Sequence, residues 1–268
     1  MKTNLRLGHT LLATLLACGL VACTSSDNGN GGTGGTVGTG GTVTPVGTGG
    51  TPGTSTSAAG CPATLPALFT DFSTATAPDA TSMRFGGNGL LSGGGSVWGG
   101  LTSEVVAAAW HISGTVTDYA GFNIYIDNCV PINASAYKGI SFTLSGTAAN
   151  QATPITFGMS TIDDTPSAAW LIAQGDTTAK TTDPGSCTPT SGNGRYYHPG
   201  CADPTKSITV PTTPTTISVL WTDLTGGQPD VSPKADQISS IYVNLSWNAT
   251  TPTPYPADLT LDNISFIP

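Results

Sequence analysis

The C-terminal part of the chain alternates apolar and polar residues, and this pattern limits the possible folds more than any other in the sequence. In the longest run, Ile238–Asn248, the side chains of Ile241, Val243, Leu245 and Trp247 fall on one face and polar side chains on the other. Successive residues of a β-strand point to opposite sides, so the run predicts a strand with one buried and one solvent-facing side. The same pattern occurs in four further segments: Gly121–Asp127, Gly139–Ser145, Ile155–Ser160 and Ile217–Trp221.

The last alternating run changes its phase. Leu259 and Leu261 share one parity while Ile264 and Phe266 share the other, which predicts a β-bulge at residues 262–263. Shorter candidate strands are Ala67–Phe72, Met83–Phe85, Val105–His111 and Ser207–Val210. No stretch shows a convincing helical period of 3.6 residues. About ten short strands separated by turn residues predict an all-β fold, a single β-sandwich domain over residues 61–268.

Composition excludes several classes of function. Charged residues make up only 9% of the 268 residues, and the formal net charge is −8. Nucleic-acid binding needs basic patches that meet phosphates, so we expect no nucleic-acid partner. The chain contains one glutamate, Glu104, which excludes chemistry that uses a pair of glutamates.

The N-terminal residues have the pattern of an export signal. Lys2 and Arg6 precede an apolar run, Leu11–Val21, that is too short to cross a bilayer, for which about 20 residues are needed. The run ends in Leu-Val-Ala followed by Cys23, which resembles the lipobox of bacterial lipoproteins. The resemblance implies a signal peptide over residues 1–22, a lipid on Cys23, and anchoring in the bacterial cell envelope. An ordinary secretory signal is the alternative.

Residue types then change abruptly. Residues 24–60 are almost entirely glycine, threonine and serine, with no apolar period that could bury a face. We therefore expect residues 23–60 to form a disordered linker after the lipidated cysteine. Thr24, rather than aspartate, follows Cys23, and in enteric bacteria this favours the outer membrane.

Four cysteines remain in the predicted domain: Cys61, Cys129, Cys187 and Cys201. They allow three disulfide connectivities. Closure of the local loop between Cys187 and Cys201 is the first choice, which leaves Cys61 with Cys129. Zinc is the rival interpretation, although no C-x₂-C pair is present.

Six motifs resemble, in their order along the chain, the galactose-binding-like jelly rolls of bacterial extracellular proteins. They are Phe69–Phe72, Tyr119–Phe122, Ser135–Phe142, the Cys187–Cys201 loop, Trp221–Leu224 and Leu259–Phe266. Many non-catalytic carbohydrate-binding modules have this fold. The resemblance implies a jelly roll whose first and last strands lie side by side, with a structural calcium ion held near them by Asp71 and Asp262. The alternative is that both carboxylates bond turn amides.

Candidate ligand residues are aromatic and amide side chains on the predicted wet faces and in the cysteine-bounded loop. Aromatic rings cover the apolar faces of sugars, while amide, carboxylate and hydroxyl groups meet their hydroxyls. The set comprises Asn123, Tyr125, Asp127, Trp170, Tyr196, Tyr197, Tyr242 and Asn244. Trp221 and Trp247 are assigned to the core. Trp98 and Trp110 are assigned neither to the core nor to the ligand-binding face.

Catalytic machinery is not evident in the sequence. No Gly-x-Ser-x-Gly motif occurs, His111 is interpreted as a strand histidine, and His198 falls in the cysteine-bounded loop. Asp163 and Asp164 are adjacent and would point to opposite sides of a strand. The leading hypothesis is a monomeric, lipid-anchored, non-catalytic module that binds polysaccharide. The alternatives are a structural or adhesive surface protein and a secreted carbohydrate-active hydrolase or lyase.

Overall fold

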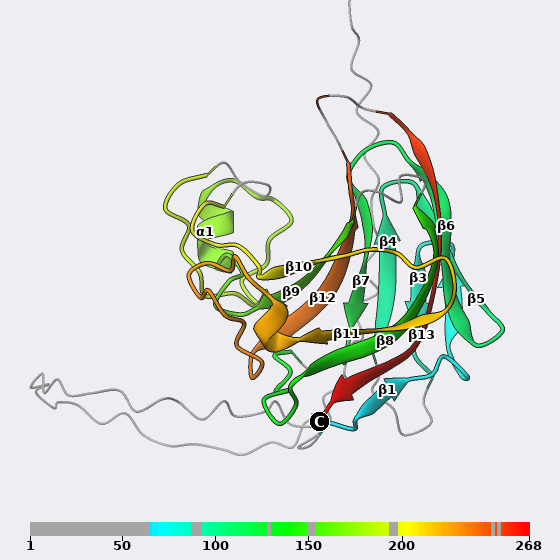
Figure 1. The fold of residues 1–268 in the computed structure, drawn as a ribbon. Helices are drawn as coiled ribbons and strands as arrows, with labels where there is room; N and C mark the ends of the chain where they lie inside the picture. Colours follow the sequence, from blue (N-terminus) through cyan, green and yellow to red (C-terminus); the bar gives the residue numbers. More distant parts are fainter. Residues whose placement is uncertain are drawn as a thin grey trace, which may run out of the picture. The chain divides into compact units, whose positions relative to one another are not determined.

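Thirteen β-strands form two antiparallel sheets in the described part of a computed structural model (Figure 1). The structure describes residues 65–86, 93–127, 130–148, 154–192, 198–247, 250 and 253–268. The predicted signal peptide, Cys23 and the linker lie outside these residues. So do Cys61 and Cys129. None of the described helices is long and apolar enough to span a membrane.

One sheet has six strands. Its order is β11-β8-β13-β6-β5, and β1 pairs with β13 beside this path. The strands are β1 (Leu68–Thr70), β5 (Leu101–Val106), β6 (Ala109–Val116), β8 (Gly139–Ala148), β11 (Thr215–Leu220) and β13 (Tyr255–Ile267). The 3-10 helix η1 (Trp221–Asp223) follows β11.

The second sheet has seven strands in the order β10-β9-β12-β7-β4-β3-β2. They are β2 (Thr76–Asp79), β3 (Ser82–Arg84), β4 (Gly94–Trp98), β7 (Ala120–Tyr125), β9 (Ile155–Thr161), β10 (Thr205–Ile208) and β12 (Ile238–Leu245). The short helix α1 (Ala168–Ala173) lies in the connection between β9 and β10, outside both sheets (Figure 1). The two sheets together make the predicted all-β jelly-roll sandwich.

The core lies between the sheets and confirms the predicted alternation. Phe122 on β7 packs edge-on against Trp110 on β6, with ring centroids 5.3 Å apart. Phe142 on β8 stacks on Phe157 of β9 at 5.9 Å. Both contacts join one sheet to the other, and all four rings are buried. Apolar burial on the inner faces therefore holds the sandwich together.

The predicted bulge is present. The pairing of β13 with β8 shifts register between Asp262 and Ser265, and Asn263 has a φ of 49°. Before the bulge β13 pairs with β6 on its other side, and after it with β1. The first and last strands consequently lie side by side, as the resemblance implied.

The structure corrects some local predictions. Val105–His111 is not one strand, because Ala107 and Ala108 turn with φ of 50° and 60° and join β5 to β6 as a hairpin. This turn lacks the glycine, asparagine or proline that marks most turns in a sequence. Trp221 is buried as expected but lies in η1, beyond the end of β11. Two short strands, β2 and β4, were not predicted.

Candidate functional site

The outer face of the seven-stranded sheet gathers most of the described candidate ligand residues. Strand register places Trp98, Gly121, Asn244 and Thr156 in one row across β4, β7, β12 and β9. The next row holds Ser96, Asn123, Tyr242 and Gly158. Side chains in one row share a face, and the neighbours along each strand are buried on the opposite side. Residues far apart in the sequence thus form one polar and aromatic surface.

Two aromatic rings lie over glycines of this face. A Cβ atom on Gly121 would come within 2.6 Å of the Trp98 ring, and one on Gly158 within 2.1 Å of the Tyr242 ring. Only glycine leaves room for these rings at the two positions. The sequence did not decide whether Trp98 and Trp110 lie in the core. The structure places the Trp98 ring on this outer face and buries Trp110 fully in the core.

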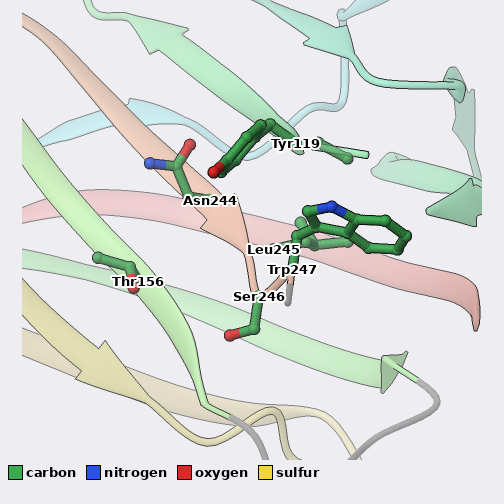
Figure 2. Close-up of a pocket in the computed structure, with 7 residues that line it drawn as sticks. Tyr119, Thr156, Asn244, Leu245, Ser246 and Trp247 are labelled. Carbon is green, nitrogen blue, oxygen red and sulfur yellow. The ribbon is translucent and has the colours of Figure 1, made fainter. Parts of the chain in front are cut away.

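A pocket of about 320 Å³ opens at the end of β12. Its lining residues are Tyr119, Ala120, Thr156, Asn244, Leu245, Ser246 and Trp247. In Figure 2 the rings of Tyr119 and Trp247 lie on one side and the polar groups of Asn244 and Thr156 on the other. Apolar rings beside hydrogen-bonding groups are what a sugar ring with its hydroxyls requires.

The structure brings four predicted residues together and separates two others from them. Asn123, Tyr125, Tyr242 and Asn244 share the outer face, where the Asn123 amide donates to the Tyr125 hydroxyl at 3.1 Å. Asp127 was expected on the wet side, but β7 ends at Tyr125 and Asp127 is buried. The alternation stops where the strand stops, so its phase does not extend to this residue.

Trp170 does not lie in a loop as expected. It belongs to α1, where Ser167 caps the helix by accepting a hydrogen bond from the Trp170 amide, and its ring packs edge-on against His198 at 5.5 Å. Tyr196 and Tyr197 lie outside the described residues. The Cys187–Cys201 disulfide that closes their loop is confirmed.

Tyr119, Thr156 and Trp247 were missed as site residues, whereas Ser246 had been expected on the wet face with Tyr242 and Asn244. Trp247 had been assigned to the core by alternation, but β12 ends at Leu245 and the half-buried Trp247 ring lines the pocket. Tyr119 precedes β7 and is 69% exposed. An aromatic residue in a polar turn segment is the one signal that could have pointed to it.

An acid lies at the β10 side of the same face. The Asp203 carboxylate accepts a hydrogen bond from the Ser160 hydroxyl at 2.8 Å. Burial is the main cause that raises the pKa of Asp203 to about 6. Burial also raises the pKa of Tyr242, and the negative charge of Asp203 adds to that effect.

The remaining candidate catalytic groups are engaged in structural contacts. His111 bonds Glu104 at 2.9 Å and Asp258 at 3.0 Å on the six-stranded sheet, and the Glu104 carboxylate is the main cause of its raised pKa. Asp163 accepts from Lys234 and Ser186.

Asp164, the neighbour of Asp163, is buried in the turn after β9. Its carboxylate accepts a hydrogen bond from the Thr161 hydroxyl at 2.8 Å and one from the Asp230 amide. The two adjacent aspartates follow the end of β9 at Thr161, so the condition that they lie on a strand is not met, and each bonds separate partners.

Asp71 and Asp262 flank the β1–β13 seam. Asp71 accepts from the amide and hydroxyl of Ser73, and Asp262 from the amide of Asn263 at 2.7 Å. Burial raises the pKa of Asp262, and the charge of Asp71 raises it further. Two neighbouring carboxylates can supply part of the six to eight oxygens of a calcium site. Among the described residues, however, no group of three or more His, Cys, Asp or Glu side chains could hold a metal ion.

Calcium at this seam stays a prediction. If calcium binds only the folded protein, calcium at about 100 times its dissociation constant adds roughly 2.7 kcal/mol to the free energy of unfolding. Thermal melts in excess calcium and in chelator measure this difference, with Asp262→Asn as the control variant that loses it. Identical melting temperatures would leave two aspartates that only bond turn amides.

Taken together, the fold and the face define a jelly-roll β-sandwich with an aromatic and polar surface on one sheet. The sequence matches no protein-family profile and no curated protein. Similar solved structures include the family 11 carbohydrate-binding module of the cellulosomal cellulase Lic26A-Cel5E of Clostridium thermocellum. That likeness has 16% identity and a TM-score of 0.41, and covers 72% of this chain and 94% of the module.

Two further solved structures are similar in fold. One is the family 11 module from Clostridium thermocellum in complex with a β-1,3-1,4-mixed-linked tetrasaccharide, with 17% identity, a TM-score of 0.39, and coverage of 70% of this chain and 96% of that one. The other is the agarase AgWH50C, with 8% identity and a TM-score of 0.37, over 65% of this chain and 22% of the agarase.

Proposed function

We propose that this protein is a non-catalytic module that binds polysaccharide on the outer face of its seven-stranded sheet. One observation carries the proposal. The pocket at the end of β12 combines two solvent-accessible aromatic rings, Tyr119 and Trp247, with the polar side chains of Asn244, Thr156 and Ser246. Its volume of about 320 Å³ is at the lower end of the range for ligand sites.

The rest of the face extends the pocket. Asn244 belongs to the pocket and also stands beside Gly121, on which the Trp98 ring lies. Two residues further back along β12, Tyr242 presents the next ring. Strands rise about 3.3 Å per residue, so successive outward side chains are about 6.6 Å apart, which is close to the size of one sugar ring. The surface therefore suits a chain of sugars better than a single one.

The test is affinity for a panel of neutral glucans, galactans, mannans and xylans, measured by pull-down for insoluble polymers and calorimetry for soluble ones. Each of four variants, Trp247→Ala, Tyr119→Ala, Tyr242→Ala and Tyr125→Ala, should weaken binding by about 1–3 kcal/mol, because each removes a stacking surface. Val231→Ala is the matched control, since Val231 is 70% exposed and lies outside the strands of this face.

The outcomes separate the three hypotheses. If all four aromatic variants weaken binding and the control variant does not, the protein is a polysaccharide-binding module. Release of reducing ends from a bound polysaccharide would indicate a hydrolase instead. Failure to bind any member of the panel would favour a structural or adhesive surface protein.

We also propose that a lipid on Cys23 tethers the module to the cell envelope, with the face directed to polymers outside the cell. The lipobox-like sequence before Cys23 supports this location. The Cys23→Ser variant should then be extracted without detergent. If the variant partitions into detergent as the unaltered protein does, Cys23 does not carry the anchor.

A further inference from the structure

Asp203 connects two strands of the binding face. It lies between Cys201 and the start of β10, at the edge of the seven-stranded sheet. Its carboxylate accepts a hydrogen bond from the Ser160 hydroxyl of β9 at 2.8 Å, and it interacts with the Tyr242 hydroxyl of β12 closely enough to shift the pKa of both groups. One half-buried acid thus lies at the hydroxyl end of an aromatic ring that belongs to the proposed site.

The sheet also contacts the hydroxyl end of Tyr242. Tyr242 pairs with Gly158 on β9, and its ring occupies the space that a side chain on Gly158 would need. The contact with Gly158 and the interaction with Asp203 thus both act on the hydroxyl end of the ring. Together they hold the ring in one rotamer with one side toward solvent.

The charges around Asp203 do not neutralise it. Asp164, in the turn after β9, faces it and raises its pKa further, and Ser160 and Tyr242 are uncharged. Lys234 bonds Asp163 and Asp230, and Lys206 bonds Asp223, so the described ion pairs leave Asp203 without a cation.

We propose that Asp203 is a positioning residue that holds the Tyr242 ring in its glycan-binding orientation while the carboxyl is ionised, so that protonation of Asp203 weakens binding. The proposal rests on the proposed function of this face. A hydrogen bond to an ionised acceptor is roughly twice as strong as one between neutral groups, so the Tyr242 hydroxyl is held more firmly by the carboxylate than by the acid. Asp203 titrates near pH 6, hence the change falls between mildly acidic and neutral conditions.

The experiment measures glycan affinity from pH 4.5 to pH 8 for the unaltered protein and for Asp203→Asn, Tyr242→Phe and Trp247→Ala. The unaltered protein should lose affinity about tenfold as the pH falls below 6. Asp203→Asn and Tyr242→Phe should each bind with a nearly flat pH profile, because one lacks the titrating group and the other lacks the hydroxyl. Trp247→Ala should bind the glycan more weakly at every pH, but its affinity should fall with decreasing pH as it does in the unaltered protein. An Asp203→Asn protein whose glycan affinity still falls with decreasing pH would overturn the proposal.

A second measurement separates this proposal from the function on which it rests. Carboxyl carbon and tyrosine ring NMR signals can be followed through the same pH range without any glycan. The Tyr242 ring signals should shift with the midpoint of Asp203, and Asp203→Asn, shown to be folded by its thermal melt, should abolish that shift. If the coupled titration is present but no glycan binds, the proposed function fails while the positioning role stands. If Tyr242 does not follow Asp203, the positioning role is wrong.

Discussion

Replacing Phe122 with alanine should lower the free energy of unfolding by about 3–5 kcal/mol, the usual cost of removing a buried aromatic ring from a core. Phe122 is 1% exposed and its ring packs edge-on against Trp110 of the opposite sheet. The contact joins the two layers, so the loss would leave a cavity that neither sheet can close alone. Urea denaturation followed by tryptophan fluorescence measures the change.

Tyr125→Ala is the matched control because it removes a similar ring from the same strand, three residues away. Tyr125 is 42% exposed and points to the opposite side of β7. Its removal should change the free energy of unfolding by no more than about 1 kcal/mol, as for most surface substitutions. Equal losses in both variants would mean that the two faces of β7 are assigned incorrectly.

Removing the disulfide with Cys187→Ser and Cys201→Ser together should lower the free energy of unfolding by about 3 kcal/mol. The two cysteines are 14 residues apart, and in the chain-entropy model a loop of about 15 residues is stabilised by this amount. Their Cα atoms are 5.9 Å apart, and both residues are buried. The double variant avoids an unpaired buried thiol.

Reduction of the unaltered protein provides the control for that substitution. Reductant should lower the stability of the unaltered protein at least to that of the double variant. Any further loss that reductant causes in the double variant would measure the predicted Cys61–Cys129 disulfide. A reduced protein as stable as the oxidised one would show that the loop is held by its backbone contacts, such as the Ser167 amide to the Cys187 carbonyl at 2.8 Å.

Several elements of the fold could be predicted because local physics determines them. Period-two patterns marked the inner faces of β7, β8, β9 and β12, and a parity change marked the bulge of β13. The β5–β6 hairpin was missed because its Ala107-Ala108 turn has no turn-forming residue. The short strands β2 and β4 were missed because a few residues carry too little pattern; in β2 every residue is exposed.

Part of the candidate site could also be predicted. The alternation in β7 and β12 is clear enough to place Asn123, Tyr125, Tyr242 and Asn244 on the solvent-facing side of their strands. Asp127 was placed incorrectly, and the pocket role of Trp247 was missed although its ring also packs against the core. Both residues lie just beyond the ends of their strands, where the phase no longer applies. Gly121 and Gly158 gave no signal, although they leave the space in which two rings lie.

Local sequence patterns were enough to predict which side of each long strand is buried and where β13 bulges, and to favour the closure of the Cys187–Cys201 loop. These features depend on the hydrophobic effect acting along a single strand, or on short loop closure, and both can be evaluated from adjacent residues. That β7, β12 and β9 are neighbours, and therefore that Tyr119, Asn244 and Thr156 line one pocket, follows from the folded arrangement alone. Strand order depends on how the two layers pack around their shared core, and no single segment carries that information.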